Sequence, residues 1–505
     1  MQIEPQSSAF AKCYARGEPQ VVWTTLVADL ETPVSAFLKI AAGRPMSFLL
    51  ESVEGGAVRG RYSIIGLEPD LVWRTVGSRA EINRAPRDRG GRFESCNQTP
   101  LAALRSLIAE SRIALPPTLP PMAAGVFGYL GYDMVRLMEE LPTPNPDPLG
   151  VADAMLLRPT IVLVFDATAD TITVVTPVRP EKGVSAKAAL ARAGERLSAV
   201  VDALEGPLDH AAANGHAGEL SVLPRSNTTP AEYERMVRAA KEYIAAGDVF
   251  QVVLAQRFEA PFELPPFALY RALRRVNPSP YLYFLDFGAF ALAGSSPEIL
   301  VKVADGTVTI RPIAGTRPRG ATPHDDKALE DELLADPKER AEHLMLLDLG
   351  RNDVGRVAEI GTVKVTDQFF IERYSQVMHI VSNVEGRLRG ECDALDALAA
   401  GFPAGTVSGA PKVRAMEIID ELEIEKRGTY AGCVGYFSAA GEMDTCIVLR
   451  TALIKDGTMY VQAGAGIVAD SEPTFEQQEC VNTAKALFRA ADEARRFASG
   501  GKRGQ

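Results

Sequence analysis

Long apolar runs of strand type follow one another at hairpin spacing, and this order constrains the fold of the 505-residue chain more than any other feature. The run from Arg158 to Phe165 is followed by Thr171 to Thr176, which indicates two antiparallel neighbours. Helical segments separate such groups, as from Thr229 to Ala246, which opens with a capping threonine and a proline. Strands in hairpin order with helices between them predict an α+β fold and argue against a regular βαβ repeat.

The length predicts two or more domains. Residues 205–228 mix Gly, Pro, Ala, Asn and Ser with little periodicity, so we expect a linker there. This places an N-terminal domain at 20–204 and a C-terminal domain at 229–495. Residues 1–20 are polar, and we expect them to be at least partly disordered.

Composition excludes several classes of protein. The net charge of −11 argues against nonspecific nucleic-acid binding. Six cysteines lie scattered without paired spacing, which predicts reduced thiols and neither a disulfide framework nor a zinc site. The N-terminus lacks an apolar signal region, and no apolar run is long enough to span a bilayer. We therefore expect a cytoplasmic protein.

Two pairs of glutamates stand out. In the stretch from Asp336 to Arg356, Glu339 and Glu342 are one helical turn apart, and Glu476 and Glu479 repeat this spacing near the C-terminus. Four carboxylates from two helices suit a hard divalent cation, most plausibly Mg²⁺. Two structural explanations stay open at this point: Asp336 and Glu339 fit a capping box, and a glutamate pair is often a solvated helix face. We expect the first of these helices to end at Gly350.

Several ordered motifs together cover most of residues 229–490. They are Gly247 to Val253, Ser295 to Glu298, Arg311 to Gly320, Asp336 to Arg356, Ser375 to His379, Gly405 to Lys412 and Gln462 to Val468. Their joint occurrence resembles the chorismate-utilising enzymes, and most closely the large subunits of anthranilate synthases. Leu49 to Ser52 and Gly125 to Asp133 extend the resemblance into the N-terminal domain. It implies a two-domain fold of β-sheets packed like a sandwich and flanked by helices.

The resemblance assigns roles to the acidic pairs and to a set of substrate-binding groups. Glu342 and Glu479 would bind Mg²⁺ directly, while Glu339 and Glu476 would hold its water shell. The ion would neutralise one substrate carboxylate and fix the ring. The pyruvyl carboxylate of chorismate would be bound by the following residues: Arg450, Tyr430, Gly464 and Gly466. Without the resemblance, we would interpret Arg450 as part of a surface salt bridge and the two glycines as parts of tight turns.

The resemblance also implies the catalytic residues, which are Glu298, His379, Thr406, Gln251 and Thr316. Glu298 matches the general acid that protonates the departing ring hydroxyl, a role that requires a raised pKa. His379, with Thr406, would act against the leaving group or in pyruvate elimination, although a lone histidine after an apolar run is more often a core residue.

Two positions separate the branches of the family. Relatives that add water carry a lysine where this chain has Gln251, and a glutamine cannot serve as that base. Aminodeoxychorismate synthases with a covalent lysine carry it where this chain has Ala314. Both residues favour a Mg²⁺-dependent lyase that adds ammonia to chorismate and eliminates pyruvate to give anthranilate, in tryptophan biosynthesis.

Ammonia would come from a partner chain. Gly432-Cys433-Val434-Gly435 is not the nucleophile elbow of a glutaminase, so we expect a separate glutamine amidotransferase subunit. We expect a hetero-oligomer, as a heterotetramer or a heterodimer.

The resemblance further implies feedback inhibition by tryptophan. The effector site would contain Glu51, Ser52, Pro278, Tyr281 and Leu282. Glu51 could receive the ammonium of tryptophan and Ser52 a hydrogen bond. Without the resemblance, these residues read as a strand end and a proline-stiffened turn.

One position departs from the family pattern. Thr483 stands where the family usually has a lysine near the substrate carboxylate, and Lys485 lies two residues further on. The departure makes a catalytically inactive, tryptophan-binding regulator conceivable, although the site residues Glu298, Glu342, His379, Arg450 and Glu479 argue against it. Two further alternatives are an aminodeoxychorismate synthase, which Ala314 argues against, and a hydrolase, which only the glutamate pairs support.

Overall fold

A computed structural model describes residues 1–54, 58–88, 91–208, 224–374 and 377–499. Its strands are β1 (Gln20–Val27), β2 (Ser47–Glu54), β3 (Val58–Val76), β4 (Arg79–Asn83), β5 (Glu94–Ser95), β6 (Gly125–Leu130), β7 (Ala154–Asp166), β8 (Thr171–Val178), β9 (Arg225–Ser226), β10 (Gln251–Pro261), β11 (Tyr281–Asp286), β12 (Ala291–Ser296), β13 (Ile299–Ala304), β14 (Thr307–Ile310), β15 (Ile313–Pro318), β16 (Lys364–Arg373), β17 (Val377–Arg387), β18 (Gly409–Ala410), β19 (Cys433–Ser438), β20 (Met443–Ile447), β21 (Thr451–Lys455) and β22 (Thr458–Ile467).

The helices are α1 (Ser7–Ala15), α2 (Pro33–Ile40), α3 (Pro100–Glu110), α4 (Ala186–Glu205), α6 (Pro230–Ala246), α7 (Pro266–Val276), α8 (Pro323–Ala335), α9 (Pro337–Gly355), α10 (Ala394–Gly401), α11 (Lys412–Leu422) and α12 (Pro473–Ser499). Short 3-10 turns occur at η1 (Pro121–Ala123), η2 (Tyr132–Leu137) and η3 (Gly405–Val407). The α+β class is confirmed, and every strand pairing among the described residues that belongs to two named strands is antiparallel.

The strands form two layers that share two long members. One layer runs β9-β10-β22-β21-β12-β11-β2-β3-β7-β8-β1. The other runs β5-β4-β3-β7-β6-β19-β20-β13-β14-β17-β16, with β15 also on β17. β3 and β7 belong to both layers because their pairing shifts register between Pro69 and Leu71. This bend turns one continuous ladder into a sandwich.

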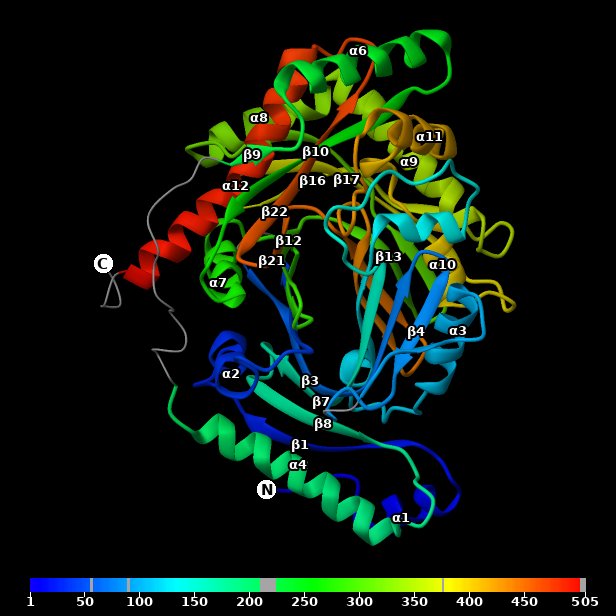
Figure 1. The fold of residues 1–505 in the computed structure, drawn as a ribbon, viewed down its shortest axis with the longest axis vertical. Coiled ribbons are helices and arrows are strands. Elements are labelled where there is room, and N and C mark those ends of the chain that lie inside the picture. Colours follow the sequence, from blue (N-terminus) through cyan, green and yellow to red (C-terminus); the bar gives the residue numbers. More distant parts are fainter. Residues whose placement is uncertain (55–57, 89–90, 209–223, 375–376, 500–505) are drawn as a thin grey trace.

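Three apolar cores follow from this layering. Phe48, Phe127 and Leu292 belong to the core between the two sheets. A second core packs the outer face of the first sheet against α1, α2, α4, α7 and α12, and a third packs the second sheet against α3, α9, α10 and α11. In Figure 1, α7 and α12 accordingly lie on one side of the sheets and α3 and α10 on the other. The sandwich with flanking helices predicted from the sequence is present.

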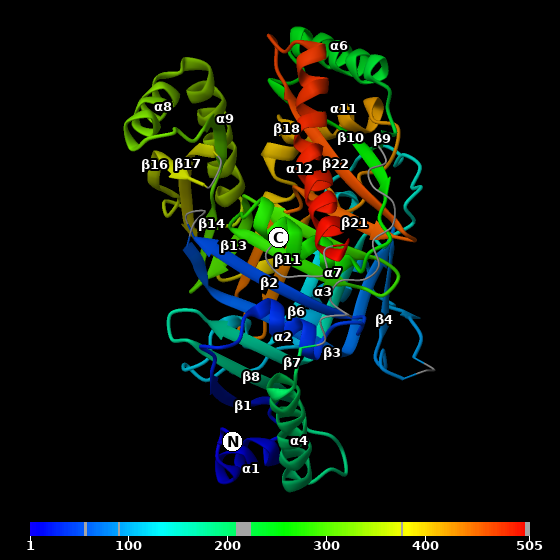
Figure 2. The same cartoon turned by 90° about the vertical axis from the view of Figure 1, so that its left-hand side faces the viewer.

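The N-terminal and C-terminal segments are joined by strand pairing. β2 pairs with β11, and β6 pairs with β19, so each sheet contains strands from both segments. Figure 2 shows α4 and α1 at one end of the molecule and α6, α8, α9 and α11 at the other. The division into domains at 20–204 and 229–495 stays a prediction. Most of the expected linker, residues 209–223, lies outside the described residues.

Local signals account for several helix boundaries. Thr229 and Glu232 form a reciprocal capping box at the start of α6, as the sequence predicted. Two expectations were wrong. We expected residues 1–20 to be at least partly disordered, but the structure describes all of them, and α1 buries Phe10 and Tyr14 against the first sheet. α9 does not end at Gly350 but continues to Gly355, because its last turn buries Val354 and an ion-paired Asp353.

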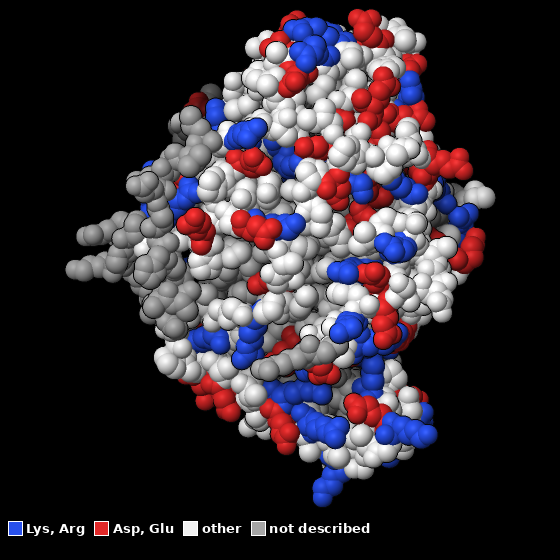
Figure 3. Space-filling view, in the orientation of Figure 1, with Lys and Arg blue, Asp and Glu red and all other residues white. Residues whose placement is uncertain are grey.

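Three further features concern the cysteines, the helices and the surface charges. All six cysteines are free thiols, as expected. None of the helices in the described part of the chain is both long and apolar enough to cross a bilayer. On the face drawn in Figure 3, basic and acidic side chains are interspersed, and neither sign of charge forms a continuous patch.

Candidate active site

The first turn of α9 is fixed by a capping carboxylate. Asp336 accepts hydrogen bonds from the backbone N–H groups of Lys338 and Glu339, at 2.9 and 3.3 Å. Glu339 uses its side chain differently from a capping box, because its Oε1 accepts a hydrogen bond from Arg317 on β15 at 3.1 Å. The cap therefore orients the helix and leaves the Glu339 carboxylate facing β15.

The four predicted metal-binding glutamates influence one another. Desolvation first, and then the charge of Glu339, raises the pKa of Glu342; Glu476 adds to this. Desolvation and the charges of Glu476, Glu342 and Glu339 raise the pKa of Glu479, although its side chain keeps contact with solvent. Glu476 is buried, and burial raises its pKa too. The start of α9 and the start of α12 thus bring four acidic groups close enough to repel one another.

The four carboxylates do not converge on a common position. Among the described residues, no group of three or more His, Cys, Asp or Glu side chains is arranged to hold a metal ion. The donor set nevertheless fits a hard cation, because it consists of carboxylate oxygens whose mutual repulsion a divalent ion would relieve. The assignment of Glu339, Glu342, Glu476 and Glu479 to Mg²⁺ stays a prediction.

Gln251 begins β10 beside this acidic group. Its Nε2 lies 3.5 Å from Glu342 Oε1, and its Oε1 is buried without a hydrogen-bond partner among the described residues. A Cβ atom on Gly466 would lie 2.3 Å from Gln251 Nε2, so a side chain at position 466 would displace the Gln251 amide from this position. The structure therefore presents a neutral, unpaired carbonyl oxygen next to the carboxylates.

Glu298 lies in the turn between β12 and β13 and is 5% exposed. Burial raises the pKa of its carboxyl group to about 8, and a hydrogen bond from Thr406 Oγ1 at 2.9 Å opposes that shift. A carboxyl group with this pKa carries its proton at neutral pH. The raised pKa that the predicted acid role requires is therefore present.

His379 on β17 is held by the neighbouring strand. Its Nδ1 lies 2.9 Å from the Gly315 carbonyl oxygen and 3.1 Å from Thr316 Oγ1. Since a carbonyl only accepts, Nδ1 carries the hydrogen and Nε2 is the unprotonated nitrogen. Burial lowers the pKa of His379 to about 4, so the ring is neutral at pH 7. The neighbouring Ala314 carries no group that could form an adduct.

Arg450 follows β20 in a left-handed backbone conformation, with φ of 47°. Among the described residues its guanidinium has no hydrogen bond or ion pair, although burial lowers its pKa and the charges of Tyr374 and Glu298 raise it. An unpaired, largely desolvated cation is the group an incoming carboxylate would neutralise. Such a backbone conformation at a bulky residue is typical of functional sites.

Arg450 opens into a surface cavity of about 410 Å³. Its lining consists of Asn277, Val377, Arg450, Phe475, Gln478, Glu479, Asn482, Thr483 and Ala486. This cavity joins the predicted anion-binding residue to the predicted metal ligand Glu479. Thr483, the departure from the family pattern, lines it too, so Arg450 is its only cationic lining residue in the described part of the chain.

Tyr430 is buried three residues before β19 begins. Burial raises the pKa of its hydroxyl, and the backbone of Gly464 is hydrogen-bonded to that hydroxyl. A Cβ on Gly464 would lie 2.9 Å from the Tyr430 oxygen. The predicted substrate-binding residues Tyr430 and Gly464 are therefore in contact, as the glycine permits.

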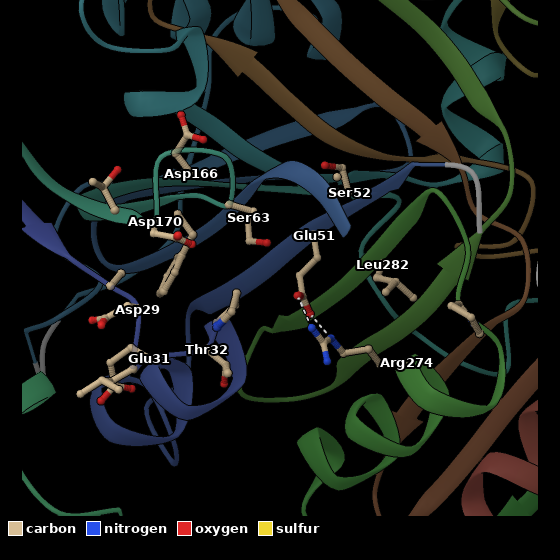
Figure 4. Close-up of a pocket in the computed structure, with 18 residues that line it drawn as sticks. Asp29, Glu31, Thr32, Glu51, Ser52, Ser63, Asp166, Asp170, Arg274 and Leu282 are labelled. Atoms are coloured by element: carbon tan, nitrogen blue, oxygen red, sulfur yellow. Dashed lines mark hydrogen bonds and ion pairs between the residues drawn. The ribbon is translucent and has the colours of Figure 1, made fainter. Parts of the chain in front are cut away.

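The predicted effector residues lie around β2. Tyr270 and Arg274 both donate hydrogen bonds to Glu51. Figure 4 shows the pair with Arg274, whose Nε lies 2.7 Å from Oε1 and whose Nη2 lies 2.9 Å from Oε2. The Glu51 carboxylate thus already has a cationic partner. β2 pairs with β11, which sets Ser52 opposite Tyr281 and Glu51 opposite Leu282.

Two cavities flank this pair of strands. One, of about 610 Å³, is lined by Glu51, Ser52, Pro278, Leu282 and several acidic residues such as Asp29 and Asp166 (Figure 4). The other, of about 650 Å³, is lined by Glu51, Ser52, Tyr281 and Leu282 together with apolar residues from both sheets. Pro278 and Tyr281 therefore open into different cavities.

Sequence reasoning did not single out four residues beside the candidate site. The Tyr374 ring lies 5.5 Å from the His379 ring, and Asn277 lines the cavity that contains Arg450. Glu423 and Arg427 form a buried ion pair behind the site. Asn277 directly precedes Pro278, which was predicted for the effector site, and no local pattern marks the other three.

Comparison with known proteins then identifies the family. Residues 61–489 match the profile described as chorismate binding enzyme. The anthranilate synthase component 1 of Cereibacter sphaeroides is 58% identical over 493 residues, which is 97% of this chain and 98% of the relative. This chain belongs to the chorismate-binding enzyme family. Its predicted resemblance to the large subunits of anthranilate synthases is confirmed.

Further members support the same placement. Anthranilate synthase component 1 of Pseudomonas aeruginosa is 51% identical, over 92% of this chain and 94% of the relative. The crystal structure of anthranilate synthase component I from Streptococcus pneumoniae has a TM-score of 0.75 and 38% identity, over 92% of this chain and 98% of the other. The menaquinone-specific isochorismate synthase of Escherichia coli, at 20% identity and a TM-score of 0.70, covers 96% of this chain and 100% of its own and shows the shared fold. The predicted chorismate-utilising fold is confirmed.

Proposed function

We propose that this family member is an anthranilate synthase component I, which converts chorismate and ammonia to anthranilate, pyruvate and water as a lyase of tryptophan biosynthesis. The observation that carries the choice of nucleophile is Gln251, whose Nε2 lies 3.5 Å from Glu342 Oε1 and whose Oε1 is buried without a partner among the described residues. A carboxamide cannot deprotonate water, whereas ammonia needs no such activation. Ala314 supports the choice because it cannot form a covalent adduct with the ring.

The chain's own residues account for the steps of this reaction. Glu298, protonated at neutral pH, donates its proton to the departing ring hydroxyl as ammonia adds. His379, with its unprotonated Nε2, then accepts the ring proton whose removal eliminates pyruvate and makes the ring aromatic. Arg450 binds the pyruvyl carboxylate, and Tyr430 with the backbone of Gly464 and Gly466 completes that side of the site.

Mg²⁺ belongs to the proposal through the four glutamates. Glu342 and Glu479 would hold it, and Glu339 and Glu476 would orient its water shell. When bound, the ion would neutralise the ring carboxylate of chorismate as a Lewis acid. The excess of negative charge at the starts of α9 and α12 supports this assignment.

Ammonia would be delivered by a separate glutamine amidotransferase subunit, in a hetero-oligomer that we expect to be a heterotetramer. Cys433 is consistent with this, because it is fully buried in β19 and burial raises the pKa of its thiol to about 12. Such a thiol is a packing group and not a nucleophile. The expected cytoplasmic location stays a prediction.

Tryptophan inhibition also belongs to the proposal, and we place the effector in the cavity of about 650 Å³. Its lining by Tyr281, Tyr436 and Met443 suits an indole, and Glu51 and Ser52 supply polar contacts. At another edge the same cavity is lined by Tyr374, whose hydroxyl donates to Glu372 at 2.7 Å and whose ring packs near His379. An occupant that moved Tyr374 would disturb the catalytic histidine.

The test is the fluorescence of anthranilate formed by the purified chain with chorismate, Mg²⁺ and an ammonium salt, with and without tryptophan. The proposal predicts anthranilate without the partner subunit and less of it with tryptophan. Tyr374→Phe, which removes the bond to Glu372, should bind tryptophan but be inhibited less. Chorismate consumed without anthranilate would reject the proposed reaction, and inhibition unchanged in Tyr374→Phe would reject this route of coupling.

A further inference from the structure

Asn277 is a half-buried polar residue that the proposed reaction has not used. It links α7 to β11 and lines the cavity of about 410 Å³ together with Arg450. Its side-chain Nδ2 is buried and has no hydrogen-bond partner among the described residues. A buried amide donor left without an acceptor costs about 1–3 kcal/mol, so its presence at a cavity wall points to a ligand that supplies the acceptor.

Backbone contacts hold Asn277 in place. Its N–H donates to the carbonyl oxygen of Leu273 at 2.8 Å, at the end of α7. Its own carbonyl oxygen accepts a hydrogen bond from the Ser295 hydroxyl. The Asn277 backbone is therefore anchored at both ends, which leaves the side-chain amide as its one unsatisfied group.

Ser295 also holds Arg450. Its N–H donates to the Arg450 carbonyl oxygen at 3.1 Å, and Ser295 is fully buried. One residue of β12 thus ties the backbones of Asn277 and Arg450 to each other. This contact also supports the left-handed conformation of Arg450, in which the guanidinium stays unpaired in the described structure.

The other amides of the cavity differ. The Asn482 Oδ1 accepts hydrogen bonds from Gln478 Nε2 at 3.0 Å and from Lys485 at 3.2 Å. Asn482 and Gln478 therefore satisfy each other at the exposed edge of α12. The Asn277 Nδ2 has no such partner in the described part of the chain, and Asn277 lines the same cavity as Arg450.

We propose that Asn277 is a substrate-binding residue whose Nδ2 donates a hydrogen bond to the carboxylate that Arg450 binds. A carboxylate has enough lone pairs to accept from a guanidinium and an amide together, and two donors fixed by Ser295 select its position as well as its charge. In the proposed reaction, on which this inference rests, that group is the pyruvyl carboxylate of chorismate. The ring carboxylate of chorismate, which the proposal assigns to Mg²⁺ at the four glutamates, would not contact Asn277.

Two substitutions test the proposal against a matched control. Asn277→Asp keeps the shape and replaces the donor by an anion, and Asn277→Ala removes the amide. Asn482→Ala, in the same cavity, removes an amide that already has partners. KM and kcat for chorismate, and the inhibition constants of pyruvate and of anthranilate, are measured for each variant and for the unaltered chain, and thermal unfolding checks the fold.

Loss of one hydrogen bond to a charged group should raise KM for chorismate about tenfold or more in Asn277→Ala, and further in Asn277→Asp, with kcat changed much less. Pyruvate should inhibit both variants more weakly by a similar factor, while anthranilate inhibition and the Asn482→Ala variant stay near the unaltered chain. An unchanged KM in a folded variant, or equal weakening of both inhibitors, would overturn the assignment. An unaltered chain that makes no anthranilate would instead reject the proposed function.

Discussion

A carboxyl group such as Glu298 lowers the stability of the folded state at neutral pH. It is buried between two strands, and hydrogen bonds from Thr406 and from the backbone of Ile313 oppose the rise in its pKa. The folded state therefore prefers the protonated form, while an unfolded glutamate ionises near pH 4.5. The free energy of unfolding contributed by Glu298 is thus lost as the pH rises from 4.5 towards about 8. A general acid gains from this preference, because it arrives at the substrate already protonated.

The pH dependence of kcat/KM for chorismate should report Glu298. At a constant concentration of free ammonia, kcat/KM should fall as the pH rises above about 8, because the acid is then ionised. Glu298→Gln should lower kcat by about 10²-fold or more, the usual contribution of a positioned acid. Thr406→Val removes the bond that favours the ionised form, so its falling limb should move to higher pH. A rate that stays level through pH 8 would contradict this role for Glu298.

The positions of the proposed catalytic groups depend on how the helices and strands pack. Arg427 and Glu423 are almost completely buried and paired. Arg427 also donates to the carbonyl oxygens of Val407 in η3 and Val253 in β10, at 2.6 and 2.7 Å. The pair joins the end of α11 to β10, which carries Gln251, and to η3, which carries Thr406.

Breaking that buried pair should destabilise the protein strongly. Arg427→Met leaves Glu423 as an uncompensated buried charge and should lower the free energy of unfolding by about 3 to 5 kcal/mol, measured in urea. Arg351→Met breaks the exposed pair with Asp348 and should cost at most about 1 kcal/mol. Equal losses from the two substitutions would mean that the buried pair does not brace the site.

Two helices carry the proposed metal ligands, so binding of the ion would depend on both helices. Glu342→Gln on α9 and Glu479→Gln on α12 should each raise the Mg²⁺ concentration for half-maximal activity at least about tenfold. Asp348→Asn is the control, since this carboxylate is also on α9 but is exposed. Activity that survives a chelator unchanged in the parent chain would exclude Mg²⁺ from the reaction.

On the scale of the whole molecule, strands from both halves of the chain build each sheet. This explains what the sequence could and could not predict. The cap at Thr229 and the α+β class follow from local patterns, and the family motifs led to Glu298, His379 and Arg450. The pKa of Glu298 and the position of Tyr374 depend on burial by distant strands. Likewise, Asn277 and Arg450 are connected only in the folded chain, where Ser295 bonds to the backbone of both. Helix α9 continues beyond Gly350 because tertiary packing outweighs this local stop signal.

The most direct test of the proposed reaction traces nitrogen from ammonium into the product. The purified chain is given chorismate, Mg²⁺ and ammonium labelled with heavy nitrogen, without glutamine or a partner subunit, and the products are analysed by mass spectrometry. The proposed function predicts anthranilate that carries the label, together with pyruvate, and about 10²-fold less of both products from Glu298→Gln. A hydroxylated product that contains no labelled nitrogen, or an aminated ring that retains its pyruvyl group, would contradict the account.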